Sequence, residues 1–388
     1  MASNAPRGGG GPNRAPSRVG FEEDASSRRP QDVALYQQTF SAWSPYLTPW
    51  KAALSFLFIG VVFVPLGAFL GIESDDIVEY RYQYDGAGAE GEGCKVNSDK
   101  PTAECNITFD VLDDMSGPVY VYYELTEFYQ NHATYVASVY TDQLLGSTST
   151  SAIDDCDPLE KNGTKYLHPC GLIANTLFND VITLDSGGEM EETGIAWKSD
   201  IDSKYDQPDG FVYTECSDGS ACATCLAEAG DTDSDGETDF IGCGDWTDPA
   251  TSTTYAYYYP YQDEFQYLYE TFPEVITPIE GVTNEHFIVW MRTSGLSDFR
   301  KLYGTIDDGI SAGTELVFNI SANFNVDEFD GTKTLVISTT TALGAENPYW
   351  AQSMFTLGAC IWGLALLTAV KEYWFPRRMG NVDMLLDD

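Results

Sequence analysis

Two long stretches without a charged residue divide the chain. They are AALSFLFIGVVFVPLGAFLGI at residues 52–72 and YWAQSMFTLGACIWGLALLTAV at residues 349–370. Each is long enough to cross a hydrocarbon core of about 30 Å as a helix. A cleaved signal peptide fits the first stretch poorly, because no small-residue cleavage site follows it. The pattern therefore predicts transmembrane helices at residues 51–72 and 349–370.

The region between these stretches, residues 73–348, has a different pattern of short β-favouring runs separated by Gly, Asp and Pro. We predict a membrane protein in which the two transmembrane helices flank a large β-rich, disulfide-bonded ectodomain with short helices. An antiparallel sandwich or jelly-roll-like core is the expected arrangement. The predicted strands are 78–84, 107–112, 119–123, 181–184, 287–291, 315–320 and 334–339, and the predicted helical pieces are 125–140 and 297–303.

The tails outside the two stretches are rich in basic residues. Nine of the 20 Lys and Arg residues lie in residues 1–51 and 371–388, although the whole chain carries a net charge of −40. Basic flanks remain in the cytosol, so we predict that residues 1–50 and 371–388 are cytosolic and that residues 73–348 are lumenal or extracellular. Residues 1–30 are predicted to be disordered, and residues 36–49, with Trp43, to form a juxtamembrane segment.

Cysteines and glycosylation sequons agree with this topology. The ninth cysteine, Cys360, lies in the second apolar stretch, whereas an even number falls in the ectodomain, as expected in an oxidising compartment. Sequons at Asn106, Asn162 and Asn319 also lie there and predict N-glycosylation. The ectodomain cysteines are Cys94, Cys105, Cys156, Cys170, Cys216, Cys222, Cys225 and Cys243.

The segment 216–243 reads as an acidic, cysteine-rich insertion. Structural disulfides of undetermined pairing among Cys216, Cys222, Cys225 and Cys243 are favoured over a redox pair at Cys222 and Cys225, because no thioredoxin-like pattern surrounds them. Asp231, Asp233 and Asp235 alternate before Gly236, as in a calcium-binding loop. Gly242 stands where an EF-hand loop has its last ligand, so a structural Ca²⁺ site and a solvated acidic loop both remain open.

Composition and motifs exclude several classes of function. A net charge of −40 repels nucleic acid phosphates. The sequence has three histidines and lacks the G-x-S-x-G, H-E-x-x-H and P-loop motifs, so we predict no enzymatic activity. We also predict no cofactor other than the structural Ca²⁺ considered for residues 231–235. The two apolar stretches contain no ionisable side chain and therefore offer no ion or proton path of their own.

Two further features suggest contact surfaces. Arg292, Arg300 and Lys301 stand in an acidic region, where they either neutralise neighbouring carboxylates or meet a partner. Small residues four apart occur in both apolar stretches, at Gly67 and Gly71 and at Ala359 and Gly363. Such pairs let helices approach closely, either to each other or to a partner.

Six strings of residues, in order along the chain, carry a resemblance to a known family. They are YQQTFSAWSPYLTP (36–49), ELTEFYQNHATYV (124–136), PCGLIANTLFND (169–180), IAW (195–197), NEHFIVWMRTSGLSDFRKLYGTI (284–306) and FDGTKTLVISTTTALGAENPYW (329–350). With them the chain resembles the cell division control protein 50 (ligand-effect modulator 3) family. Its members are accessory β-subunits of type IV P-type ATPases, the phospholipid flippases.

The resemblance implies a non-catalytic subunit that the ATPase needs for folding, exit from the endoplasmic reticulum and activity. The ATPase would move phospholipid from the exoplasmic to the cytosolic leaflet, in the endoplasmic reticulum, the Golgi and endosomal system or the plasma membrane. The resemblance also implies disulfides Cys94–Cys105 and Cys156–Cys170, and it gives the insertion no role. Contacts with the partner are expected at Trp43, Arg292, Arg300, Lys301 and Gly363. The rival interpretations are a two-span adhesion or receptor protein and a lumenal thiol oxidoreductase.

Overall fold

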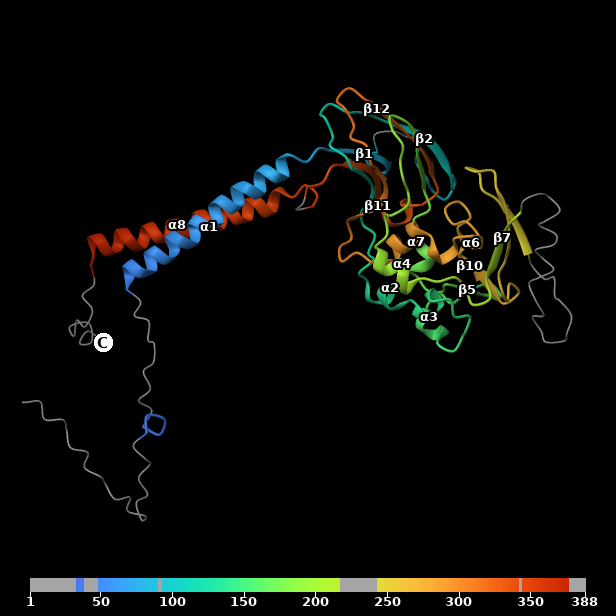
Figure 1. The fold of residues 1–388 in the computed structure, drawn as a ribbon, viewed down its shortest axis with the longest axis horizontal. Helices are drawn as coiled ribbons and strands as arrows, with labels where there is room; N and C mark the ends of the chain where they lie inside the picture. Colours follow the sequence, from blue (N-terminus) through green and yellow to red (C-terminus); the bar gives the residue numbers. More distant parts are fainter. Residues whose placement is uncertain (1–32, 38–47, 90–92, 217–242, 342–343, 377–388) are drawn as a thin grey trace, which may run out of the picture. The chain divides into compact units, whose positions relative to one another are not determined.

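The computed structural model describes residues 33–37, 48–89, 93–216, 243–341 and 344–376. Along the chain, a β-rich region lies between two long helices, α1 (Pro49–Asp75) and α8 (Pro348–Trp374) (Figure 1). Among the described residues, these are the two helices long and apolar enough to cross a membrane. The larger sheets are antiparallel and the region contains disulfides, so the predicted fold class is confirmed.

The strands of the β-rich region follow the hydrophobic pattern closely. Strands are found within a few residues of the predicted positions at 78–84, 107–112, 119–123, 181–184, 315–320 and 334–339. Together with one strand that the sequence did not predict, they form sheets of order β1-β13-β3-β11 and β2-β12-β6. The bounds are β1 (Glu79–Gly86), β2 (Ala103–Asp110), β3 (Val119–Leu125), β6 (Val181–Ser186), β11 (Phe299–Ile306), β12 (Glu315–Ala322) and β13 (Thr332–Ser338).

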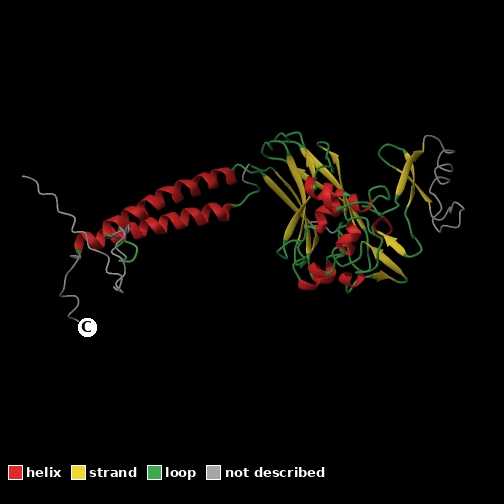
Figure 2. Ribbon diagram, turned by 60° about the horizontal axis from the view of Figure 1, so that its bottom comes forward, coloured by secondary structure: helices red, strands yellow, loops and turns green. Residues whose placement is uncertain are grey.

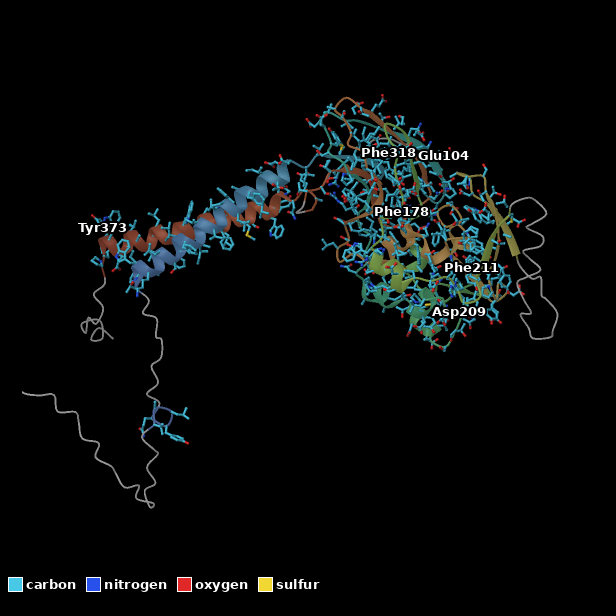
Figure 3. The ribbon with its side chains drawn as sticks, viewed as in Figure 1. Glu104, Phe178, Asp209, Phe211, Phe318 and Tyr373 are labelled. Atoms are coloured by element: carbon cyan, nitrogen blue, oxygen red, sulfur yellow. A yellow bond between two sulfur atoms is a disulfide. The ribbon has the colours of Figure 1, made fainter. Side chains whose placement is uncertain are left out.

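The core lies between these two sheets (Figure 2). Alternate residues of β3, from Val119 to Leu125, are buried, as a strand with one covered face requires. Inward residues of both sheets belong to one hydrophobic cluster, in which Tyr123 of β3 stacks on Phe178 with ring centroids 3.8 Å apart. Phe178 and Phe318 mark this core in Figure 3. The predicted sandwich therefore forms by burying the two apolar faces against each other.

The strand predicted at 287–291 is wrong, because these residues form the helix α7 (Glu285–Met291). Phe287, Ile288 and Trp290 are all buried, and an apolar run that is covered on every side has no periodicity to separate strand from helix. Asn284 decides the outcome locally. Its side chain accepts a hydrogen bond from the Phe287 amide and so caps the first turn.

The helix predicted at 297–303 is also wrong, because β11 occupies this stretch. Its buried residues alternate from Phe299 through Lys301 to Tyr303, and the burial of a lysine disguised the period of two. In the piece predicted as helical at 125–140, the only regular helix is α2 (Ala133–Ala137), and Leu125 instead ends β3.

Smaller elements complete the β-rich region. One small sheet has the order β10-β5-β4, and another has the order β7-β9-β8. In the second sheet, β7 precedes residues 217–242 in the chain and β8 follows them. These strands are β4 (Lys161–Asn162), β5 (Lys165–His168), β7 (Val212–Cys216), β8 (Cys243–Thr247), β9 (Thr254–Tyr258) and β10 (Phe265–Tyr267). Short helices are α3 (Thr141–Leu144), α4 (Lys198–Lys204) and α6 (Leu268–Thr271), and 3₁₀ turns lie at Ile153–Cys156, Ala174–Thr176, Gly281–Thr283 and Asp327–Phe329.

Glycines bring α1 and α8 into close contact. A Cβ atom built on Gly67 would lie 2.7 Å from the backbone nitrogen of Phe355, and one built on Gly358 would lie 2.7 Å from a methyl group of Val64. Neither position accepts a larger side chain without separating the helices. At Gly363, by contrast, no described atom beyond the neighbouring turns of its own helix lies within 4 Å of such a Cβ. The close approach within the chain therefore depends on Gly67 and Gly358, and also on Gly60, where a Cβ atom would lie 2.1 Å from the Trp362 ring.

Candidate functional site

The cationic residues noted in the sequence meet where α7 packs against β11. Lys301 of β11 extends its ammonium group to the C-terminal end of α7. There it donates to the carbonyl oxygens of Val289 and Trp290, both at 3.0 Å, and of Arg292, at 2.5 Å. The last carbonyls of a helix lack partners within the helix and carry its negative dipole end, so a cation is favoured at this point.

Lys301 is thus engaged inside the chain rather than presented to solvent. The residue is 7% exposed, and burial, with the nearby charge of Arg292, lowers the pKa of its amine to about 7. The three carbonyl acceptors oppose this effect because they bind the charged form. Lys301 therefore acts as the cap of α7.

Arg300 neutralises carboxylates of neighbouring strands. Its Nη1 lies 2.7 Å from Glu79 Oε2, and its Nη2 lies 3.8 Å from Glu124 Oε2. Arg81 shares Glu124 as an ion-pair partner. Burial acts to lower the pKa of Arg300, but the hydrogen bond that it donates to Glu79 and the charges of both glutamates raise the pKa overall. The interpretation as an internal neutralising group fits the contacts of Arg300. Lys301 instead binds backbone carbonyls, a role that the sequence did not indicate.

Arg292 is engaged on one side only. Its Nε donates to Asp200 Oδ2 at 2.5 Å, and its guanidinium stacks over the Trp197 ring at 3.7 Å from the centroid. Hydrogen bonds from Arg292 and Lys204 hold the pKa of Asp200 below its usual range. The Arg292 side chain is 42% exposed, and no described residue accepts a hydrogen bond from its Nη groups. Those donors remain available to another molecule.

A cavity of about 340 Å³ lies beside these residues. Residues 299–302 of β11 form one wall, and Ile288 and Val289 of α7 form another. Ile195, Ala196 and Trp197 complete the lining, with Arg292 next to the indole ring. We call this cavity the β11 groove. It combines a strand edge, an exposed aromatic ring and a guanidinium group.

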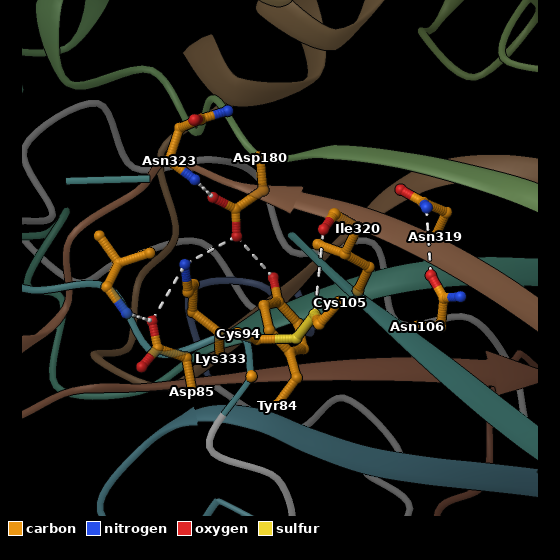
Figure 4. The surroundings of a disulfide bond; sticks show 12 residues. Tyr84, Asp85, Cys94, Cys105, Asn106, Asp180, Asn319, Ile320, Asn323 and Lys333 are labelled. Carbon is orange, nitrogen blue, oxygen red and sulfur yellow. Dashed lines mark hydrogen bonds and ion pairs between the residues drawn. A yellow bond between two sulfur atoms is a disulfide. The ribbon is translucent and has the colours of Figure 1, made fainter. Parts of the chain in front are cut away.

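A buried charge cluster, which sequence reasoning missed, ties the sheets together (Figure 4). Lys333 is fully buried and pairs with Asp180 at 2.8 Å and with Asp85 at 3.2 Å. Tyr84 donates its hydroxyl to Asp180 at 2.8 Å, and burial raises the pKa of this phenol well above its usual value. Asp85 also accepts from the Val96 amide, at 3.2 Å, in the loop that follows Cys94. The only sequence signal was a lysine inside an otherwise uncharged strand.

Disulfides and sequons lie as follows. Disulfides join Cys94 to Cys105 and Cys156 to Cys170, the pairs that the resemblance implies. Cys216 is also disulfide-bonded. Asn106 and Asn319 are direct partners across β2 and β12, with Nδ2 of Asn319 donating to Oδ1 of Asn106 at 3.1 Å. The exposed Asn162 lies in β4.

Several predicted positions lie outside the described residues. These are Trp43, Cys222, Cys225, Asp231, Asp233 and Asp235, and the side chain of Cys243 is likewise not described. Within the ranges that the structure describes, no group of three or more His, Cys, Asp or Glu side chains is arranged to hold a metal ion. The predicted calcium loop thus stays a prediction.

Comparison with known proteins gives a consistent result. The LEM3 (ligand-effect modulator 3) family / CDC50 family matches residues 70–378. The chain is 31% identical to ALA-interacting subunit 3 of Arabidopsis thaliana, over 93% of this chain and 91% of that protein. It is 30% identical to Cell cycle control protein 50A of Mus musculus, over 93% and 94%, and 31% identical to Cell cycle control protein 50B of Homo sapiens, over 89% and 95%. The family match includes the β-rich region and α8, and these relatives align with most of the chain, so this protein belongs to the LEM3 (ligand-effect modulator 3) / CDC50 family.

Proposed function

We propose that this chain is the non-catalytic β-subunit of a phospholipid flippase. It binds a type IV P-type ATPase, which requires it for folding, for exit from the endoplasmic reticulum and for activity. The observation that carries this proposal is family membership, together with a full-length relative named as an ALA-interacting subunit. The absence of ionisable residues from residues 52–72 and 349–370 adds support, because lipid transport then has to be driven by another chain.

The proposal includes a topology. Residues 1–50 and 371–388 lie in the cytosol, and residues 73–348 lie on the lumenal or extracellular side with glycans at Asn106, Asn162 and Asn319. Basic tails and the disulfides of the β-rich region support this arrangement. Protease treatment of sealed microsomes tests it, since cleavage of the β-rich region from the cytosolic side would contradict the topology.

Contacts with the ATPase are proposed at Trp43, Arg292, Arg300, Lys301 and Gly363. Arg292 is the strongest of these candidates because its Nη groups have no acceptor among the described residues. Arg300 and Lys301 contribute mainly to the local positive potential, since their donors are already engaged. Gly363 offers a surface without a side chain, on which a helix of another chain can pack.

Affinity purification of the tagged full-length chain from its own membranes tests the function. A large P-type ATPase should co-purify, and reconstituted liposomes should flip labelled phospholipid and hydrolyse ATP only when both chains are present. An adhesion protein or a thiol oxidoreductase would bring down no such ATPase. Translocation or ATP hydrolysis by this chain alone would show that the subunit assignment is wrong.

A further inference from the structure

Within the part of the chain that the structure describes, the outer edge of β11 lacks a pairing strand over half of its length. β11 is the last strand of the sheet β1-β13-β3-β11, so its backbone pairs with β3 on one side only. On the outer side, Thr305 exchanges both backbone hydrogen bonds with Glu191, at 2.7 and 2.8 Å. No outer backbone hydrogen bond joins residues 299–303 to another described residue. Alternate residues direct their N–H and C=O groups outward, so this stretch is an unpaired strand edge.

The unpaired edge opens into the β11 groove, and the wall opposite it is fixed. Residues 299–302 line the groove, and Ile195, Ala196 and Trp197 face them. The Glu285 carboxylate at the start of α7 accepts from the amides of Gly194 and Ala196, at 2.9 and 2.8 Å, and holds this opposite segment in place. The groove is therefore a preformed slot beside a strand edge, the geometry that accepts an extended peptide as an added strand.

The charge of the groove selects the kind of peptide. Residues 73–348 contain 11 Lys and Arg residues against 52 Asp and Glu residues, so an acidic segment is repelled over most of this region. At the groove, Arg292 presents Nη donors that no described residue uses. A guanidinium group has the planar, paired donors that match a carboxylate. Attraction of an acidic chain is thus concentrated beside the unpaired edge.

We propose that an extended acidic segment of the partner adds as a strand to residues 299–302 of β11 and places a carboxylate on Arg292. This inference rests on the proposed function, because the segment is assigned to the lumenal side of the ATPase. Strand pairing supplies affinity through the backbone, and Arg292 supplies the preference for acidic residues. A small free anion would use Arg292 alone and would be indifferent to the strand edge.

Synthetic peptides test the mode of binding on the full-length chain in detergent. The probes are fluorescent octapeptides of alternating Thr and Glu, a Thr–Lys counterpart, and two acidic versions with N-methyl groups on every Thr or on every Glu. A paired strand turns one set of N–H groups toward β11, so the two methylated peptides should differ in affinity by about tenfold or more. The Thr–Lys peptide should not bind. Equal affinities of the methylated peptides, or no saturable binding of the acidic one, would overturn the proposal.

Two matched substitutions locate the peptide. Arg292→Gln should abolish binding of the acidic peptide, whereas Arg81→Gln should leave it unchanged, because Arg81 bonds Glu124 and does not line the groove. Thermal melts of both variants show whether each retains the fold. Loss of binding in both variants, or in neither, would place the peptide elsewhere.

Photo-cross-linking in native membranes separates this proposal from the function on which it rests. A benzophenone amino acid at Leu302, which lines the groove, should cross-link to an acidic segment of the co-purifying ATPase. The same probe at Leu112, which is 75% exposed and does not line the groove, should not. If the ATPase co-purifies but Leu302 does not cross-link to it, the groove proposal fails and the subunit assignment stands. If no ATPase co-purifies, the assignment itself fails.

Discussion

Replacing Lys333 with Met tests the buried cluster that ties the sheets together. Lys333 has no exposed surface, and its ammonium group lies between Asp180 at 2.8 Å and Asp85 at 3.2 Å while also donating to the Phe324 carbonyl at 2.7 Å. Met has a similar volume, so the main effect is electrostatic. Two carboxylates that are at most 1% exposed would lose their counter-charge. Removal of one partner from a buried ion pair costs about 3–5 kcal/mol of unfolding free energy.

The remaining partners of the carboxylates reduce this cost. Asp180 still accepts from the Tyr84 hydroxyl and the Phe324 amide, and Asp85 still accepts from the Val96 amide. We therefore expect about 3 kcal/mol, which corresponds to a fall in Tm of roughly 6–12 °C for a domain of this order of size. The assay is thermal unfolding of the full-length chain in detergent with its disulfides intact.

Two further variants sharpen this measurement. Lys95→Met at an exposed position should change stability by less than about 0.5 kcal/mol. Adding Asp85→Asn to Lys333→Met should restore part of the lost stability, because the double variant buries one uncompensated carboxylate instead of two. A fall in Tm below about 2 °C for Lys333→Met, or no recovery in the double variant, would refute the electrostatic account of the cluster.

Burial lowers the pKa of His168 to about 4, below the value of about 6.5 in the unfolded chain, so the unfolded state binds more protons as pH falls between these values. Stability should therefore decrease by up to about 3 kcal/mol from pH 6.5 to 4, and His168→Gln should flatten this part of a Tm-against-pH profile. Gly67→Leu should separate α1 from α8 and reduce thermal stability, whereas Gly363→Leu should leave the chain's own stability intact; equal losses would contradict the packing at Gly67. If Gly363 meets the ATPase, Gly363→Leu should also reduce the yield of co-purified ATPase. Asn284→Ala should remove the N-cap of α7 and cost about 1 kcal/mol in thermal unfolding, and an unchanged Tm would show that the cap is dispensable.

Many residues of the candidate site could be predicted from the sequence, but their arrangement in space could not. Arg292, Arg300 and Lys301 stood out because they are basic in an acidic region, but no sequence feature distinguished their roles. The structure separates them by their contacts: Lys301 caps α7, Arg300 bonds glutamates on other strands, and Arg292 keeps donors that no described residue accepts. Such roles depend on which element lies opposite, and spacing along the chain does not contain that information.

The sequence by itself determined the features that depend on local composition and on a period of two. These are the apolar helices α1 and α8 and strands such as β3 and β12, because a stretch that must lie in lipid or cover one face of a sheet needs a fixed pattern of apolar residues. Only the tertiary structure decided the identities of α7 and β11. On α7, burial of the apolar run, including Trp290, left no helical period in the sequence. On β11, the burial of the cationic Lys301 hid the period of two that is typical of a strand.

The tertiary structure also decided which charges are paired. Lys333 meets Asp85 and Asp180 only because β13, β1 and the segment before β6 converge. The Nη groups of Arg292, which have no acceptor among the described residues, take their position from the fold of residues 195–200. A contact between residues far apart in the chain costs loop-closure entropy and desolvation free energy. Only the packing of the complete core offsets these costs, so the whole region determines which distant residues meet. For the same reason, the edge of β11 is visible only once its sheet has formed.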